Sequence, residues 1–158
     1  MEYFYLGIDP STVSTGFAVI DREGKLIEYG VIKPGKTLLP HQKLHYQYEH
    51  ITALMKKYPI IGMNCEEQFG GPSQATFKKL CQVTGVMMLL AAQHGVKFEL
   101  KYPASWRKDF HGNGAVKKED TLILVNELFD LELKKKDNDK ADAIGLGFVA
   151  YKTGEKKP

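Results

Sequence analysis

Long apolar runs, cysteine-rich motifs and a strong charge of either sign are all missing from this sequence. Its longest apolar run covers residues 86–92, far short of the about 20 residues that a membrane-spanning helix needs. The first residues lack the basic region of a signal peptide. Two cysteines, Cys65 and Cys81, are too few for a disulfide framework or a zinc site, and both are expected to be buried and reduced. We therefore expect a protein without membrane spans that works in a reducing cytoplasm.

The size of the chain fits one domain. A length of 158 residues allows a full hydrophobic core, and we expect a single domain over residues 1–152 with a flexible tail over residues 153–158. The formal net charge of +3 comes from 22 basic and 19 acidic residues. This mild excess permits binding to nucleic acid without demanding it, so the placement of the charges matters more than their sum.

The periodicity of apolar residues predicts an α/β fold. Five segments have the pattern of strands: residues 3–9, 15–21, 26–32, 60–67 and 96–101. Helices are predicted at residues 40–57, 74–94, 117–129 and 139–151, with a turn or short helix at 103–110. Short turns join the first three strands into an antiparallel meander, and the later strands alternate with helices. We expect a mixed five-stranded sheet, three strands antiparallel and two parallel, flanked by helices.

Acidic residues end two of the predicted strands and begin the last helix. Asp9 ends the first strand, Glu66 and Glu67 end the fourth, and Asp139 and Asp142 begin the helix. Strand ends and a helix start can bring distant residues to one point, where a carboxylate cluster needs cations to neutralise it. The pattern indicates bound Mg²⁺ and a phosphate substrate. A structural explanation stands beside it, because Asp9 suits a turn and the last pair suits a helix cap.

Two features bear on how these acids could meet. Side chains alternate along a strand, so only one of Glu66 and Glu67 can face Asp9, and the strand pattern leaves both open. The last helix carries small residues at positions 141, 143, 145, 147 and 150. Small residues allow a helix to pack closely on a sheet, which would press Asp139 and Asp142 against the strand ends.

Basic and aromatic residues are interleaved between these acids. The basic residues are Lys78, Lys79, Lys97, Lys101, Arg107, Lys108, Lys117 and Lys118. The aromatic residues are Phe69, Tyr102, Trp106 and Phe110. Together they can form a groove that follows phosphates and offers stacking surfaces to bases. Any one of them is more often a solvated charge or a core ring.

With these motifs in view, the chain resembles the RuvC family of Holliday-junction resolvases, which has the ribonuclease H-like fold. Gly-Ile-Asp-Pro at residues 7–10, followed by Thr15-Gly16, is similar to the first motif of the family. Glu67-Gln68 is similar to its Glu-Gln pair after the fourth strand. Gly-Asn-Gly at residues 112–114 with Lys118, and Asp-Lys-Ala-Asp-Ala at residues 139–143, are similar to its last two motifs.

The resemblance implies a role for specific residues. It implies that Mg²⁺, which Mn²⁺ can replace, is bound by Asp9, Glu67, Asp139 and Asp142, because the neighbouring Gln68 favours Glu67 over Glu66. It implies that Lys118 lies near the scissile phosphate, with Lys117 as the alternative. We expect the DNA to contact residues from the interleaved basic and aromatic set: Phe69, Lys78, Lys79, Arg107, Lys108, Lys117 and Lys118.

The resemblance also implies a homodimer that cuts two strands of a four-way DNA junction. The helix at 74–94 is the candidate interface, because its second half is apolar on every face and part of Met87, Met88, Leu89 and Leu90 should be left for a partner.

Three other interpretations stay open. The first motif also opens sugar kinases and actin-like ATPases, but those proteins need two such domains with a cleft between them. A nuclease of the same fold can act on RNA or on flaps. A branched-DNA-binding protein without catalysis is the third, and the full set of acids argues against it.

Overall fold

The computed structural model describes residues 1–68, 73–113 and 115–156. The strands are β1 (Phe4–Asp9), β2 (Thr15–Asp21), β3 (Leu26–Ile32), β4 (Ile60–Glu66) and β5 (Lys97–Lys101). The helices are α1 (Pro40–Lys57), α2 (Gln74–Gln93), α3 (Pro103–His111), α4 (Lys118–Phe129) and α5 (Asn138–Gly154), with a 3₁₀ turn at Lys135–Asp137. Each predicted element is present within three residues of its expected bounds, and the segment expected as a turn or short helix is α3.

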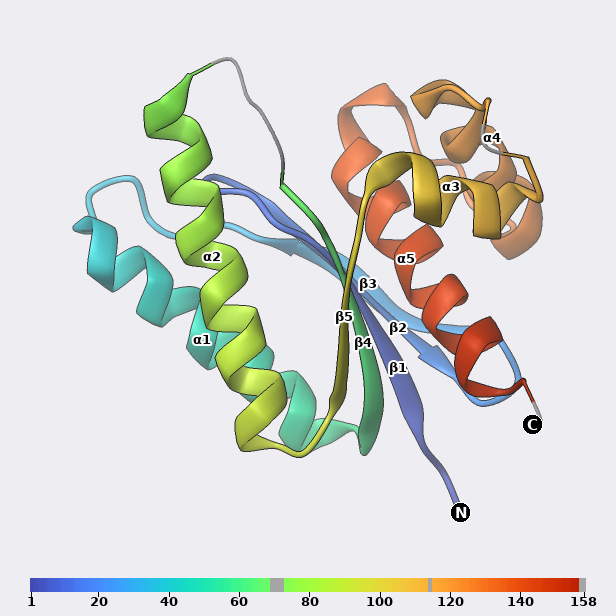
Figure 1. The fold of residues 1–158 in the computed structure, drawn as a ribbon, viewed down its shortest axis with the longest axis horizontal. Coiled ribbons are helices and arrows are strands. Elements are labelled where there is room, and N and C mark those ends of the chain that lie inside the picture. The colour runs from blue at the N-terminus through green and yellow to red at the C-terminus, as the bar shows by residue number, and fades with distance from the viewer. Residues whose placement is uncertain (69–72, 114, 157–158) are drawn as a thin grey trace.

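The sheet has the expected mixed topology. Its strand order is β3-β2-β1-β4-β5, with β2 antiparallel to both β1 and β3 and β4 parallel to both β1 and β5. Figure 1 shows α1 and α2 on one face of the sheet and α3, α4 and α5 on the other. The carboxyl ends of β1 and β4 therefore lie at the same edge, beside the beginning of α5. Among the described residues, no helix is long and apolar enough to cross a bilayer.

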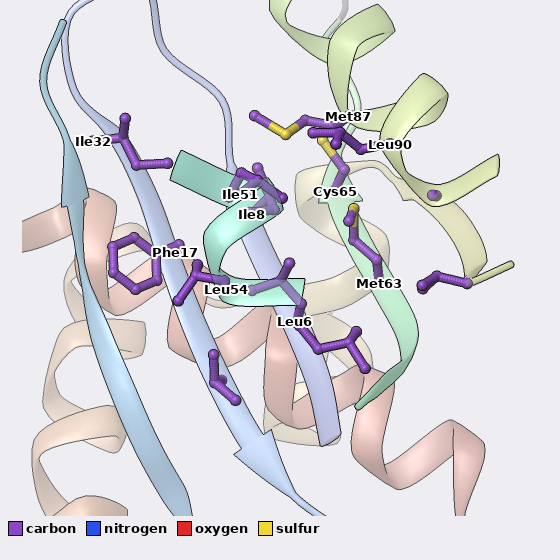
Figure 2. Close-up of a cluster of buried hydrophobic side chains, with 14 of the residues drawn as sticks. Leu6, Ile8, Phe17, Ile32, Ile51, Leu54, Met63, Cys65, Met87 and Leu90 are labelled. Carbon is purple, nitrogen blue, oxygen red and sulfur yellow. The ribbon is translucent and has the colours of Figure 1, made fainter. Parts of the chain in front are cut away.

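Alternation along the strands divides the core into two layers. Leu6 and Ile8 of β1 and Met63 and Cys65 of β4 point to α1 and α2, where they pack with residues such as Ile51 (Figure 2). The residues between them, including Gly7 and Asn64, point to α5. Asn64 donates a hydrogen bond from Nδ2 to the Leu146 carbonyl oxygen at 3.2 Å, which ties β4 to α5.

Glycines bring α5 directly onto β1 and β2. A Cβ atom added to Gly7 would overlap the backbone of Ala143 and Gly147, and one added to Gly16 would overlap the Asp139 carbonyl. Gly7 and Gly16 thus allow the helix backbone to touch the sheet backbone, as the small residues of the last helix predicted. Because Gly16 pairs with Asp9 across the β1–β2 ladder, this contact brings the first turn of α5 next to the end of β1.

Two expectations need correction. The last helix does not end at Tyr151 but continues to Gly154, and Glu155 accepts a 2.8 Å hydrogen bond from the Tyr5 hydroxyl. The first part of the expected flexible tail is therefore held on the sheet by this contact. Cys65 is buried as expected, but Cys81 is exposed, because it lies on the outer side of α2.

Replacing Gly16 by alanine should separate α5 from β2. The added methyl group meets backbone rather than a movable side chain, so we expect a loss of about 1–3 kcal/mol in the free energy of unfolding and a fall of roughly 3–10 °C in Tm. Differential scanning calorimetry measures both. Gly35→Ala is the control, since a Cβ there makes only an ordinary van der Waals contact with Leu38. Equal Tm values for the two variants would contradict the close approach.

Candidate active site

Asp9 is a buried carboxylate at the end of the central strand. Only 7% of the residue is exposed. It follows Gly7 by two positions and therefore faces α5, on the same side of the sheet. Across the ladder its partner is Gly16, so no side chain stands between Asp9 and the start of the helix. The sequence-based expectation that Asp9 lies at the sheet edge beside the last helix is met by this geometry.

Glu66, rather than Glu67, faces the other acids. Ile8 pairs with Cys65 in the parallel ladder, so Asp9 and Glu66 are equivalent positions of neighbouring strands. Asn64, two residues earlier, already reaches Leu146 of α5, and alternation carries Glu66 to that face and Glu67 away from it. The expectation that Glu67 joins Asp9 is wrong in this structure. The neighbouring Gln68 pointed to Glu67, but the register of β4 decides the direction of each side chain.

The first turns of α5 supply the remaining two acids. Asp139 is half-buried and its backbone lies on Gly16, whereas Asp142, one turn later, is only 3% exposed. Among the described hydrogen bonds, neither side chain accepts from a backbone N–H of the helix's first turn, and the N-cap residue of α5 is Asp137. Capping therefore does not account for these two acids.

Cations and one indole surround the acids. Arg107 of α3 lies with Nη2 3.4 Å from Asp142 Oδ2, and Lys118 at the start of α4 lies with Nζ 4.0 Å from the same oxygen. Trp106 donates a 2.8 Å hydrogen bond from Nε1 to Glu66 Oε2. Lys117 is the N-cap residue just before α4, and its backbone N–H donates to Asp120 Oδ2 at 2.8 Å. Of the two neighbouring lysines, Lys118 is the one whose ammonium group lies beside the acids.

Burial and mutual repulsion shift the pKa values of Asp9, Glu66 and Asp142 upward. Burial raises the pKa of Asp9 well above its usual range, and the charges of Glu66, Asp142 and Asp139 add to this effect. Burial, with Glu66 next, raises the pKa of Asp142 to about 6 although Arg107 and Lys118 oppose the shift. The pKa of Glu66 is raised by burial and lowered by its hydrogen bond from Trp106. The neighbouring cations therefore offset only part of the negative charge.

The donor set fits a hard divalent cation. Its members are all carboxylates, which are the oxygen ligands that Mg²⁺ and Mn²⁺ prefer. Burial, and then the neighbouring acids, raise the pKa values of Asp9 and Asp142, and a bound cation would favour their charged forms. Within the described part of the chain, no three His, Cys, Asp or Glu side chains lie close enough to form a ready-made metal cage. The four acids thus share one electrostatic environment without being drawn together as ligands.

A buried polar ring supports the turn that follows Asp9. The Ser11 N–H donates to Thr15 Oγ1 at 3.0 Å, the Thr15 hydroxyl donates to Gln47 Oε1 at 2.6 Å, and Gln47 Nε2 donates to the Ser11 carbonyl at 3.0 Å. Gln47 is 1% exposed, so these bonds replace water. They fix the β1–β2 turn beside the site. Sequence reasoning missed Gln47, because a single amide on a helix has no distinctive spacing.

The residues predicted to bind DNA are spread over both sides of the sheet. Lys108 is exposed on α3, whereas Lys78 and Lys79 are exposed on α2, which covers the opposite face (Figure 1). Lys79 and Val13 line a hollow of about 220 Å³ beside the β1–β2 turn. Arg107 is only 14% exposed and pairs with Asp142. Phe69 lies outside the described residues.

Two aromatic rings that could have stacked on bases are part of the core. Trp106 is fully buried and Phe110 is 6% exposed, and both pack against α5. They cannot offer a free ring face to a nucleotide without unpacking the helix. Tyr102 is 54% exposed and remains on the surface. The interleaving of aromatic and basic residues in the sequence thus mixes core rings with surface charges.

Comparison with known proteins identifies one family. The model of the family described as crossover junction endodeoxyribonuclease RuvC matches residues 5–149. Among curated relatives, RuvC of Aliarcobacter butzleri is 31% identical over 147 residues, which covers 91% of this chain and 95% of the relative. RuvC of Chloroherpeton thalassium is 26% identical over 149 residues, covering 92% of this chain and 80% of the relative.

Solved structures show the same fold. Thermus thermophilus RuvC in complex with a Holliday junction substrate superimposes with a TM-score of 0.84 at 20% identity and covers 100% of this chain and 99% of its own. The yeast mitochondrial Holliday junction resolvase gives a TM-score of 0.61 at 13% identity and covers 94% of this chain and 79% of its own. The expected ribonuclease H-like fold is confirmed.

The ionisation of Asp142 should make the free energy of unfolding depend on pH. A folded-state pKa of about 6, against a usual 3.8, means that the folded protein holds this proton more tightly, so stability is lost as the pH rises from about 4 through 6. In EDTA, Asp142→Asn should therefore stabilise the protein more at pH 7 than at pH 5, by about 1 kcal/mol. Thermal unfolding of both proteins at both pH values measures this.

The variant comparison is needed because other groups titrate in the same range. Burial lowers the pKa values of His50 and His111, and their charging in the unfolded state makes stability rise with pH. These contributions are common to the wild type and to Asp142→Asn and cancel in the difference. A Tm difference that is the same at pH 5 and pH 7 would contradict the raised pKa of Asp142.

Proposed function

Because this chain belongs to the RuvC family of crossover junction endodeoxyribonucleases, we propose that it resolves four-way DNA junctions by paired, metal-dependent nicks. The observation that carries the proposal is the group of four acids at the carboxyl ends of β1 and β4 and the start of α5, of which Asp9 and Asp142 are buried. Burial and the neighbouring acids raise the pKa values of Asp9 and Asp142, and added positive charge would stabilise their ionised forms. A protein that only bound DNA would gain nothing from four acids at its phosphate site.

The ligands that we propose are Asp9, Glu66, Asp139 and Asp142, with Mg²⁺ as the physiological ion and Mn²⁺ as its substitute. All four belong to elements held rigidly by the contact of α5 with the sheet. When bound, two such ions supply an activated water and stabilise the leaving 3′ oxygen of the phosphodiester. Glu66 replaces Glu67 in this proposal because of the β4 register.

Lys118 and Arg107 are suited to hold the scissile phosphate. Both carry their charge within 4.0 Å of Asp142, and Lys118 is half-exposed, so its ammonium group can turn from the acid to an incoming phosphate. Arg107 Nε is buried without a hydrogen-bond partner among the described residues. A phosphate oxygen is an acceptor that would satisfy it. The remaining lysines, Lys78, Lys79, Lys108 and Lys117, are proposed to follow the DNA backbone, so affinity should fall steeply with salt.

The proposed assembly is a homodimer through α2. Two symmetric nicks are most simply made by two sites related by a two-fold axis. On α2, Met87 and Leu90 are buried in the core, whereas Met88 is 47% and Leu89 53% exposed. Leu89 also lines a shallow hollow with Leu44 and Tyr48 of α1. A second copy can cover this apolar surface, and methionine adapts its shape to such a contact.

Cleavage of a set of matched substrates tests the proposed function. Four-way junction, linear duplex, flap and RNA–DNA hybrid are incubated with the protein and Mg²⁺, and the cuts are mapped on each strand. We expect symmetric pairs of nicks in the junction and little cleavage of the others. Preferential cutting of the hybrid or the flap would instead assign the chain to a different nuclease of the same fold.

The proposed DNA substrate and the two free thiols support a place of action in a reducing cytoplasm.

The register of β4 predicts opposite results for two neighbouring variants. Glu66→Gln should reduce junction cleavage about 100-fold or more, equivalent to about 3 kcal/mol in the barrier, because it removes a ligand charge. Glu67→Gln is the matched control and should keep substantial activity, since its side chain points away from Asp9. Single-turnover cleavage of a labelled junction measures both. The reverse order would mean that Glu67 is the ligand.

The proposed dimer predicts that charge on α2 separates the two subunits. Met88→Glu combined with Leu89→Glu would bury unpaired charge in the interface, so we expect monomers that still bind a junction but cut its two strands independently. Light scattering gives the mass, and a cruciform plasmid distinguishes paired from single nicks. Ile123→Glu on α4, at an apolar residue of similar exposure (55%), is the control. A wild type that is monomeric at micromolar concentration would exclude this interface.

A further inference from the structure

The Trp106 side chain contacts three parts of the site. Its indole N–H donates to Glu66 Oε2 at 2.8 Å. Its ring lies over Gly145, where an added Cβ would come within 2.7 Å of Cζ3, and Gly145 is one helical turn after Asp142. The Arg107 guanidinium lies 4.8 Å from the centre of the same ring and reaches Asp142. One side chain of α3 thus touches the acid of β4, the helix that carries Asp139 and Asp142, and the Arg107 guanidinium.

We propose that Trp106 is a positioning residue that holds the Glu66 carboxylate in the orientation needed to bind the catalytic cation. This inference rests on the proposed metal-dependent function and deepens it. No motif in the sequence assigned such a role, because the interleaving of aromatic residues indicated stacking on bases instead.

The chemistry of the indole makes the contact directional. An indole N–H can only donate, and an ionised carboxylate can only accept, so the bond cannot reverse. Hydrogen bonds to charged groups are stronger than those between neutral groups. The bond engages Oε2 and leaves Oε1 to face a cation. A glutamate without this donor would have to give up the freedom of its rotatable bonds when a cation binds.

The packing around the ring fixes the donor itself. Trp106 is fully buried between Gly145, Phe110 and the Arg107 side chain, so the N–H direction is set by the core. Groups that orient a metal ligand typically change metal affinity or activity by about 10–100-fold when they are removed. A ring that merely filled the core would need the same shape but not the N–H.

The chain contains one tryptophan, which allows a test that changes the N–H alone. Expression with β-(3-benzothienyl)alanine in place of tryptophan substitutes a sulfur atom for the N–H and keeps the shape of the ring. We expect the Mn²⁺ dissociation constant, measured by titration calorimetry, to increase about 10-fold, with little change in Tm. Phe129→Leu is the control: it should lower Tm, because it removes a ring that packs on Phe148 in the same core, but keep the Mn²⁺ affinity.

The single indole also gives a direct spectroscopic signal. In wild type, the one indole ¹H–¹⁵N NMR peak should shift and saturate as Mg²⁺ is added, because the charge on Glu66 is redistributed. In Glu66→Gln the peak should not follow Mg²⁺. This measurement does not depend on the folding of the benzothienyl protein.

The outcomes separate the inference from the proposed function. If the benzothienyl protein binds Mn²⁺ as tightly as wild type does, the positioning role is wrong but the metal site is supported. The same holds if wild type binds Mn²⁺ but its indole peak does not shift when Mg²⁺ is added. If wild type binds no Mn²⁺ with or without a four-way junction, the metal-dependent function itself fails. A weaker Mn²⁺ affinity at unchanged Tm supports the inference.

Discussion

The direct contact between the α5 backbone and the sheet backbone is the constraint on which the site depends. Gly7 and Gly16 have no side chains to hold the helix away, so its first turns lie against the end of β1. This contact brings Asp139 and Asp142 into the same electrostatic environment as Asp9. A single methyl group at this contact would move two acids at once. The fold and the site are therefore specified by the same packing.

The acids oppose the stability of the fold that brings them together. Burial and like charge raise the pKa values of Asp9 and Asp142, which is a free-energy cost at neutral pH. Arg107 and Lys118 offset part of it, and Trp106 offsets part of it at Glu66 through a hydrogen bond. The remaining cost would be removed by divalent cations. Cation binding and junction cleavage would then depend on the same carboxylates.

Much of this structure follows from local sequence signals. The strands and helices were predictable because apolar periodicity and Gly or Pro at the turns agree, and Asp9 was predictable because it ends a buried strand. The choice of Glu66 was not, since Glu-Glu-Gln reads equally well in two registers and the bond from Asn64 to α5 decides between them. The burial of Trp106 could not be predicted either, because its ring packs on Gly145, which is distant in sequence.

Anomalous scattering from crystals soaked in Mn²⁺ would show which carboxylates bind the metal. We expect Mn²⁺ peaks coordinated by carboxylate oxygens of Asp9, Glu66 and Asp142, with the Glu67 side chain outside the coordination sphere. The oxygens should lie within about 2.0–2.4 Å of the metal, as expected for hard divalent ions. Absence of peaks at saturating Mn²⁺, or a peak coordinated by Glu67 in place of Glu66, would contradict this expectation.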